Sequence, residues 1–324
     1  KAPKIRFIGG LDKDFVTDNS TVEGWSKNNI IYDNPLGIEI DTENQETKRK
    51  LSESLDINRY DFKSFKYNYL GPLVFAGFNQ DDGVYLGGGV SIIRHGFRKE
   101  PYASKHRLTA NVAPETFAWN FSYDGDFKRV VGDLGFNLQA SVKAPNYFSN
   151  FYGLGNETTI DESVDENFYR IRYEEVLFYP GLTIEAGNNS LIKIGPAYQY
   201  VKVRSEIDKF INTVGSTIDP SIFDGSHFGG AKITADIKTI ENTIYPENGI
   251  RWKTELEWQA ELNNENRKFS RVKSELSVYY SFQEPTLITL ASRVGGASNA
   301  GQFAVYQGNT IGGNAGLGRN GTVR

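Results

Sequence analysis

The sequence predicts an all-β fold: a transmembrane antiparallel β-barrel preceded by a short β-roll-like or irregular N-terminal segment. Three observations support this prediction. From Tyr67 onward, apolar and polar residues alternate over runs of ten or more residues, the charged residues of each run fall on the face opposite to the apolar ones, and Tyr, Trp and Phe recur near the run ends. This pattern is typical of strands that face a wet lumen on one side and lipid on the other.

The first 58 residues have a different pattern of apolar and polar residues. Short apolar runs at Lys4–Ile8 and Asn29–Tyr32 are separated by Gly, Asp and Asn, and a charged stretch follows over Asp41–Asp56. We therefore expect a first domain over residues 1–58, made of a β-roll-like segment and a charged linker. The barrel domain is expected over residues 59–324.

The clearest alternating runs are Ile250–Glu261 and Arg271–Phe282. Lys253 and Glu255 fall on the polar face of the first run. Two soluble sheets packed together would also cover the apolar faces, but no amphipathic helical segment is available as a cover, and the charged faces suit an enclosed lumen. We expect contact with acyl chains for the residues that point the other way, which include Trp252, Leu256, Val272 and Leu276.

Eleven runs are expected to form strands, and their connections differ in length. The long connections, at residues 144–166, 205–226 and 299–324, follow odd-numbered runs, whereas tight turns are expected at Gly125-Asp126, Gly187-Asn188-Asn189 and Glu284-Pro285. Barrels with short periplasmic turns and long outer loops show this asymmetry. Because an odd count leaves an unpaired edge in hydrocarbon, we expect further strands beyond Arg324. The expected strands are 68–79, 83–95, 102–113, 115–125, 127–143, 167–187, 189–204, 227–240, 249–262, 268–283 and 286–298.

The composition excludes several other classes of protein. Forty acidic and 36 basic residues give a formal charge of −4, so no broad basic surface for nucleic acid is expected. The chain has no Cys, which excludes disulfides, thiolate metal sites and cysteine nucleophiles. Its 3 His residues have no partners at a metal-ligand spacing, and no Gly-x-Ser-x-Gly motif is present. We therefore expect no catalytic site, no cofactor and no enzyme activity in this chain.

The end of the sequence resembles a known family. Leu317–Arg324, preceded by Ile311-Gly312-Gly313, resembles the sixth extracellular loop of the BamA/TamA superfamily, the bacterial surface antigen barrels. The resemblance implies a barrel of sixteen strands in which this loop follows the eleventh, and it implies that Arg324 acts as a structural latch. Tyr67–Gly83 together with Gly96–Tyr102, and Asn150–Thr158, are similar to the form of this barrel found in Bacteroidetes-type bacteria. Tyr245–Arg251 resembles the family's Pro-x-x-Gly turn that leads into a strand.

The resemblance also implies a function and a location. Members of the family insert or translocate proteins at the bacterial outer membrane through a weak lateral seam, so outer-membrane lipid, client proteins and a larger membrane complex are the implied partners. The seam would involve the first strand, with Tyr69, Gly71, Pro72 and Leu73. A passive porin-like channel, or a structural subunit of a larger outer-membrane complex, is the alternative.

The N-terminal segment carries a second resemblance. Ile5–Phe15 is similar to a degenerate calcium β-roll nonapeptide, which makes Asp12 and Asp14 calcium candidates, with a simple turn-rich linker as the alternative. In Bacteroidetes-type relatives a similar segment joins a metallophosphoesterase to the barrel. The resemblance therefore implies a fusion whose upstream enzyme is not present in this chain.

Overall fold

The structure is a computed structural model of residues 1–324, and it forms two compact units, Lys1–Lys66 and Tyr67–Arg324. No helix among the described residues is long and apolar enough to cross a membrane. The described residues are 5–10, 12–19, 29–42, 47–54, 58, 65–79, 83–153, 161, 163–187, 190–214, 220–263, 267–283, 286–311 and 322–323.

Unit 1 is a coil of short parallel strands. Strands β1 (Arg6–Ile8), β3 (Ile30–Asp33) and β5 (Lys48–Leu51) form one sheet, and β2 (Asp14–Asp18) and β4 (Ile38–Thr42) form the other. Along the chain the strands alternate between the two sheets, and every pairing is parallel. This arrangement matches the predicted β-roll-like segment. The whole of β3 is buried and supplies the core of the unit.

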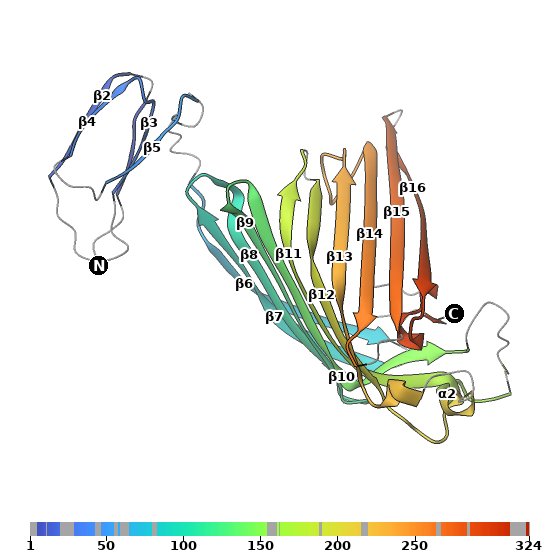
Figure 1. Cartoon of the computed structure of the whole chain (residues 1–324). Helices are drawn as coiled ribbons and strands as arrows, with labels where there is room; N and C mark the ends of the chain where they lie inside the picture. The colour runs from blue at the N-terminus through green and yellow to red at the C-terminus, as the bar shows by residue number, and fades with distance from the viewer. Residues whose placement is uncertain are drawn as a thin grey trace. The chain divides into compact units, whose positions relative to one another are not determined.

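Unit 2 is built on an antiparallel sheet whose strands pair in chain order, β6 next to β7 and so on to β16 (Figure 1). The predicted eleven strands are confirmed, since the path from β6 to β16 contains that number. Two short strands, β17 (Thr310–Ile311) and β18 (Thr322–Val323), lie off this path. The strands of the path are β6 (Tyr69–Asn79), β7 (Gly83–Gly96), β8 (Lys99–Ala113), β9 (Ala118–Val131), β10 (Leu134–Phe151), β11 (Arg170–Glu185), β12 (Leu191–Val203), β13 (Ser226–Lys238), β14 (Gly249–Glu261), β15 (Lys268–Gln283) and β16 (Leu287–Gly301).

The predicted turn at Gly125-Asp126 is wrong. Both residues lie inside β9, where Gly125 pairs with His106 of β8 and with Leu138 of β10. A Gly-Asp pair is a common turn signal, but here partners on both sides satisfy the backbone groups, so the strand continues. The chain turns instead at Gly132-Asp133, where Gly132 has a φ of 58°, a left-handed conformation that glycine adopts without steric cost.

The predicted asymmetry of the connections holds. The longest links within the sheet follow β10 and β12, and they leave from one end of the sheet, which we call the loop side (Figure 1). Short turns follow β7, β9 and β11 at the opposite end, which we call the turn side. A hydrophobic cluster closes over the inner face at the loop side. It includes Phe151, Ile171, Val203, Ile211, Ile222, Ala304 and Val305.

The long connections supply much of this cluster through short helices. These helices are η2 (Glu166–Tyr169), α2 (Phe210–Thr213), η3 (Pro220–Phe223) and η4 (Val305–Gln307). Ile211 of α2 and Ile222 of η3 are buried in the cluster. The inner face of these strands is therefore packed with apolar side chains from the connections at the loop side.

Candidate functional site

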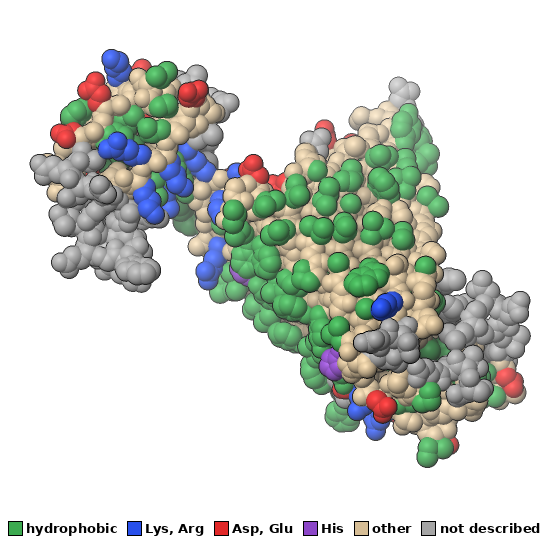
Figure 2. Space-filling view, viewed as in Figure 1, with side chains coloured by type: hydrophobic (Ala, Val, Ile, Leu, Met, Phe, Trp, Pro, Cys, Tyr) green, Lys and Arg blue, Asp and Glu red, His purple; other side chains and the backbone are tan. Residues whose placement is uncertain are grey.

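The two faces of the sheet differ in chemistry, as predicted. The apolar residues of β14 and β15 lie exposed on the outer face, where Trp252 is 50%, Leu256 42%, Val272 45% and Leu276 36% accessible. Figure 2 shows this outer face, with hydrophobic side chains spread over the strands and few charged ones among them. Exposed apolar area on this scale is typical of a surface that faces lipid.

Two tryptophans lie on the apolar outer face of β14. Trp252 lies near the turn side and Trp258 six positions further toward the loop side, and both are about half exposed. At ~3.4 Å per residue they lie roughly 20 Å apart along the strand, which at a strand tilt of ~35–45° corresponds to a height of roughly 15 Å. Both rings therefore fit within the ~25 Å apolar band that outer-membrane barrels present to lipid.

The inner face carries charges that neutralise one another across neighbouring strands. Glu255 is the centre of one group, because two lysines approach its two carboxylate oxygens. Such ladders hold the strands in register and leave no large excess of either charge. The ion pairs among the described residues of β13, β14 and β15 include Arg251–Asp236 (2.8 Å), Lys238–Asp236 (2.9 Å), Lys232–Glu255 (2.9 Å), Lys253–Glu255 (3.2 Å) and Arg271–Glu257.

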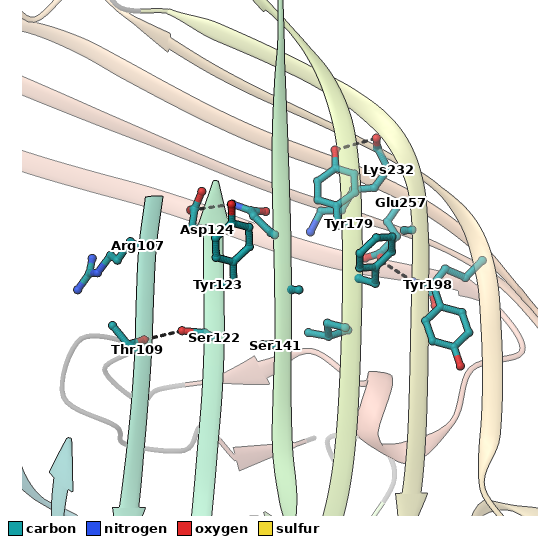
Figure 3. Close-up of a pocket in the computed structure, with 16 residues that line it drawn as sticks. Arg107, Thr109, Ser122, Tyr123, Asp124, Ser141, Tyr179, Tyr198, Lys232 and Glu257 are labelled. Carbon is teal, nitrogen blue, oxygen red and sulfur yellow. Dashed lines mark hydrogen bonds between the residues drawn. The ribbon is translucent and has the colours of Figure 1, made fainter. Parts of the chain in front are cut away.

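A pocket of about 460 Å³ lies in the inner wall (Figure 3). Side chains of both charges line it, among them Arg107 and Asp124 at one end and Lys232 and Glu257 at the other. Thr109 and Ser122 hydrogen-bond to each other across β8 and β9 at 2.6 Å. Within the described residues, the donors and acceptors of this wall suit contact with water or with a polar chain, and no nucleophile with an adjacent base lines the pocket.

Lys193 is a buried cation beside this pocket. Its Nζ donates to Asn137 Oδ1 at 2.7 Å and to the carbonyl oxygen of Tyr179 at 3.0 Å, and it lies 3.5 Å from the centre of the Tyr179 ring. The ring and the carbonyl oxygens replace water around the ammonium group. Period-2 alternation places Lys193 on the inner face, but it cannot indicate that Gly181 leaves the room the side chain occupies.

A polar chain holds the segment after β16 to the inner wall. Gln307 of η4 is buried, its Nε2 donates to Gln199 Oε1 at 3.3 Å, and its Oε1 accepts from the Ala304 N–H at 2.9 Å. Gln199 in turn donates to Glu175 at 2.7 Å, and Lys143 pairs with the other oxygen of that carboxylate at 2.6 Å. Sequence reasoning missed this chain, because Gln307 lies 108 positions after Gln199 and no motif marks either residue.

The predicted seam residues all lie in β6, the first strand of the sheet. Among the described residues β6 pairs with β7 alone, and its other edge has no partner. Tyr69 lies over Gly71, where an added Cβ would meet the tyrosine ring, and Gly71 is buried. Pro72 is exposed opposite Val90 of β7, a position that an edge strand tolerates because proline has no N–H to donate.

Leu73 points to the inner face together with Phe75, whereas Val74 is 88% exposed on the outer face. The sequence of β6, from Tyr69 to Asn79, contains no charged residue. The first strand is therefore apolar on both faces, in contrast to the charged inner faces of β13, β14 and β15. It has no ion pair that could fasten it to a neighbour.

The predicted latch, Arg324, lies outside the described residues. The two residues before it, Thr322 and Val323, form β18, which pairs in parallel with Asn150 and Phe151 at the loop-side end of β10. The end of the chain therefore reaches the wall of the sheet at the loop side. The role of Arg324 itself stays a prediction.

In unit 1, the structure does not bring Asp12 and Asp14 together as a recognisable metal site. Asp14 Oδ2 accepts a hydrogen bond from the Gly10 N–H at 3.1 Å, whereas Asp12 is exposed. Within the described residues there is no group of three or more acidic or histidine side chains that could hold a metal ion. Asp33, which sequence reasoning did not single out, is fully buried, and burial raises the pKa of its carboxyl, with a further contribution from Asp14. Calcium binding stays a prediction.

The comparisons with known proteins show the fold. No family model matches the chain, and no curated protein matches it by sequence. Among solved structures, the chain is similar to BamA from Haemophilus ducreyi lacking POTRA domains 1–3, with a TM-score of 0.52 and 14% identity. The match covers 77% of this chain and 45% of the BamA chain, so the chain spans less than half of that protein. The sheet has an apolar outer face and a charged inner face, and its fold is that of a BamA-like outer-membrane β-barrel.

Proposed function

We propose that this chain is the major part of an outer-membrane barrel that inserts or translocates proteins through a weak seam at β6. The observation that carries the proposal is the character of β6: a proline, no charged residue and apolar side chains on both faces. Within the bacterial outer membrane, such a strand could exchange partners with an incoming strand at low cost, because few side-chain contacts have to be broken.

The contrast with β14 and β15 supports this role. Those strands share the Arg271–Glu257 ion pair, whereas β6 pairs with β7 along its whole length through backbone hydrogen bonds but has no charged residue that could form an ion pair. A barrel that opens sideways needs one weak junction in an otherwise firm wall, since unpaired backbone groups in hydrocarbon cost several kcal/mol each. The implied partners are outer-membrane lipid, client proteins and a larger membrane complex.

Cysteine crosslinking tests the seam. The chain has no native Cys, so pairs can be introduced without background. In the intact protein, cysteines placed along β6 and along the final strand should form few stable disulfides. The matched control is Thr254→Cys with Ser274→Cys, a directly opposed pair on β14 and β15 that should crosslink efficiently. Efficient crosslinking along the whole length of the β6 junction would overturn the proposal.

One observation favours the alternative of a passive porin-like channel, namely the charged and polar inner face. The packed cluster at the loop side opposes it, because Ile211, Ile222 and Val305 fill space beside the inner wall that an open channel would leave to water. Conductance in planar bilayers separates the two functions. An insertion barrel should show low and intermittent conductance, whereas steady, large single-channel currents from the intact protein would favour the channel.

In the insertion role the chain needs no catalytic residues of its own. A further possibility within the same proposal is that the barrel anchors or exports a fused N-terminal domain, with unit 1 as the connecting segment. Removing unit 1 from the intact protein should then release or mislocalise the upstream domain, while insertion of client proteins continues. Loss of insertion in the same variant would contradict a purely connecting role for unit 1.

A further inference from the structure

The outer face of the sheet has a hollow near the loop side. A groove of about 730 Å³ lies over strands β7 to β10, within the ~300–1,000 Å³ range of ligand pockets. Its outward-facing side chains are all small or apolar, and Figure 2 shows hydrophobic side chains gathered over this part of the sheet. The outward side chains around it are Leu86, Ala110, Val112, Trp119, Phe121 and Val142, with Gly88 among them.

The hollow arises from the register of four strands. Gly88 of β7 pairs with Ala110 of β8, and Ala110 pairs with Phe121 of β9, which pairs with Val142 of β10. Gly88 and Ala110 carry almost no side-chain volume, so the floor is low beside the bulkier Phe121 and Val142. Nothing but backbone, the Leu73 carbonyl oxygen at 3.3 Å, approaches the position that a Cβ on Gly88 would take.

The groove is closed toward the lumen. The ring of Phe75 covers Gly87 on the inner side, where an added Cβ would meet the ring atoms. The next row toward the loop side, formed by Leu86, Val112 and Trp119, makes an apolar wall. The hollow is therefore open to the surroundings of the barrel and not to its interior.

Its position and lining determine the kind of ligand. The groove is continuous with the apolar outer face, so its surroundings are hydrocarbon rather than water. An unfilled hollow would leave the atoms that line it without van der Waals partners, and a flexible hydrocarbon chain can follow its shape. Trp119 is half exposed and lies one residue inside the loop-side end of β9, the level at which tryptophans of membrane proteins meet lipid headgroups.

We propose that this groove binds one acyl chain of a lipid in the leaflet on the loop side. The chain lies over Gly88 and Ala110, beside Phe121 and Val142, and the headgroup lies at the level of Trp119. The site depends on the barrel fold alone and not on the insertion role, so it can be tested separately.

Photolabelling with a lipid of defined composition tests the site. The intact protein is reconstituted into phosphatidylethanolamine and phosphatidylglycerol vesicles that contain a trace of phosphatidylcholine with a diazirine in one acyl chain. After illumination, trypsin releases residues 108–128 as one peptide, which contains four of the outward-facing groove residues, Ala110, Val112, Trp119 and Phe121. Residues 254–267 form a reference peptide from the flat outer face of β14. We expect several-fold more label in the first peptide than in the second.

Two substitutions make the test specific. Ala110→Phe fills the floor of the groove and should reduce the label in residues 108–128 to the level of the reference peptide. Ala231→Phe, on the exposed outer face of β13, should leave the label unchanged. Folding of each variant is checked by its heat-dependent mobility in detergent gels, and Ala110→Leu provides a smaller filling group if the phenylalanine variant does not fold.

Two results would overturn the proposal. Equal labelling of both peptides in the unsubstituted protein would mean that lipid contacts the groove no more than the flat wall. Retention of the label in a folded Ala110→Phe or Ala110→Leu variant would mean that the label does not come from the groove. If a photoreactive residue in place of Val112 crosslinks to a polypeptide in native membranes while lipid label stays at the reference level, the groove holds a protein segment instead.

Discussion

Gln307 should hold the segment after β16 against the inner wall, and removing its side chain should loosen that segment. In Gln307→Ala two hydrogen bonds are lost, one to Gln199 at 3.3 Å and one from the Ala304 N–H at 2.9 Å. At ~1 kcal/mol for each, the local free energy of opening should fall by about 2 kcal/mol. Because ~1.4 kcal/mol corresponds to a tenfold change in an equilibrium constant, hydrogen exchange should accelerate by roughly 30-fold.

The amides to follow are those of Ala304, Gln307 and Gly308, whose N–H groups are bonded within the segment. Hydrogen exchange with mass spectrometry on the reconstituted protein measures them directly. Gln302→Ala is the matched control, because Gln302 has an exposed side chain five positions earlier on the same segment. Unchanged protection in Gln307→Ala, or equal loss in the control, would refute the reasoning.

Three further predictions follow from other parts of the chain. Burial raises the pKa of the Asp33 carboxyl above its value in the unfolded chain, so the contribution of Asp33 to stability is complete below the unfolded pKa and is lost as the pH rises through the folded pKa. Asp33→Asn should therefore slow hydrogen exchange in β3 at neutral pH. An equal slowing of exchange in acid would contradict this prediction. Leu256→Arg, on the outer face near the middle of β14, should cost ~2–4 kcal/mol in a vesicle refolding titration, and a cost near zero would argue against lipid contact. Arg271→Ala leaves the buried Glu257 without its ion partner and should lower the midpoint of thermal unfolding. Adding Glu257→Gln to this variant should partly restore the midpoint. No change in the midpoint of either variant would mean that these ion pairs do not stabilise the sheet.

Much of the barrel could be predicted because strand formation depends on residues that are close together along the chain. The alternation of Trp252, Leu256 and Trp258 with charged residues determines both the strand and its two faces, since side chains point to opposite sides of a sheet with a period of two. Turn residues then mark the boundaries between strands. Alternation and turn residues together were sufficient to predict the number and order of the strands. The prediction failed at Gly125, where a local turn signal competes with backbone pairing on both sides that no local pattern records.

The candidate site could be predicted only in part. The absence of charge from β6 is visible in the sequence, and so is Pro72, but the place of β6 as the first strand of the sheet, next to β7, follows from the pairing of the strands. The buried Asp33 looks like an ordinary loop acid until the parallel coil encloses it. Gln199 and Gln307 are 108 positions apart, and no sequence pattern near either residue predicts their contact.

The sequence by itself determined how many strands form and in which order, which face of each strand is apolar, and at which end the long connections lie, because all three depend on neighbours along the chain. Only the tertiary structure decided the register between strands. Register places Gly88 beside Ala110 and so forms the outer groove, and it sets Lys193 over Gly181 and joins Lys232 to Glu255. Hydrogen bonding between strands determines these contacts. The conformational entropy lost when distant segments come together is compensated only when the complete sheet forms.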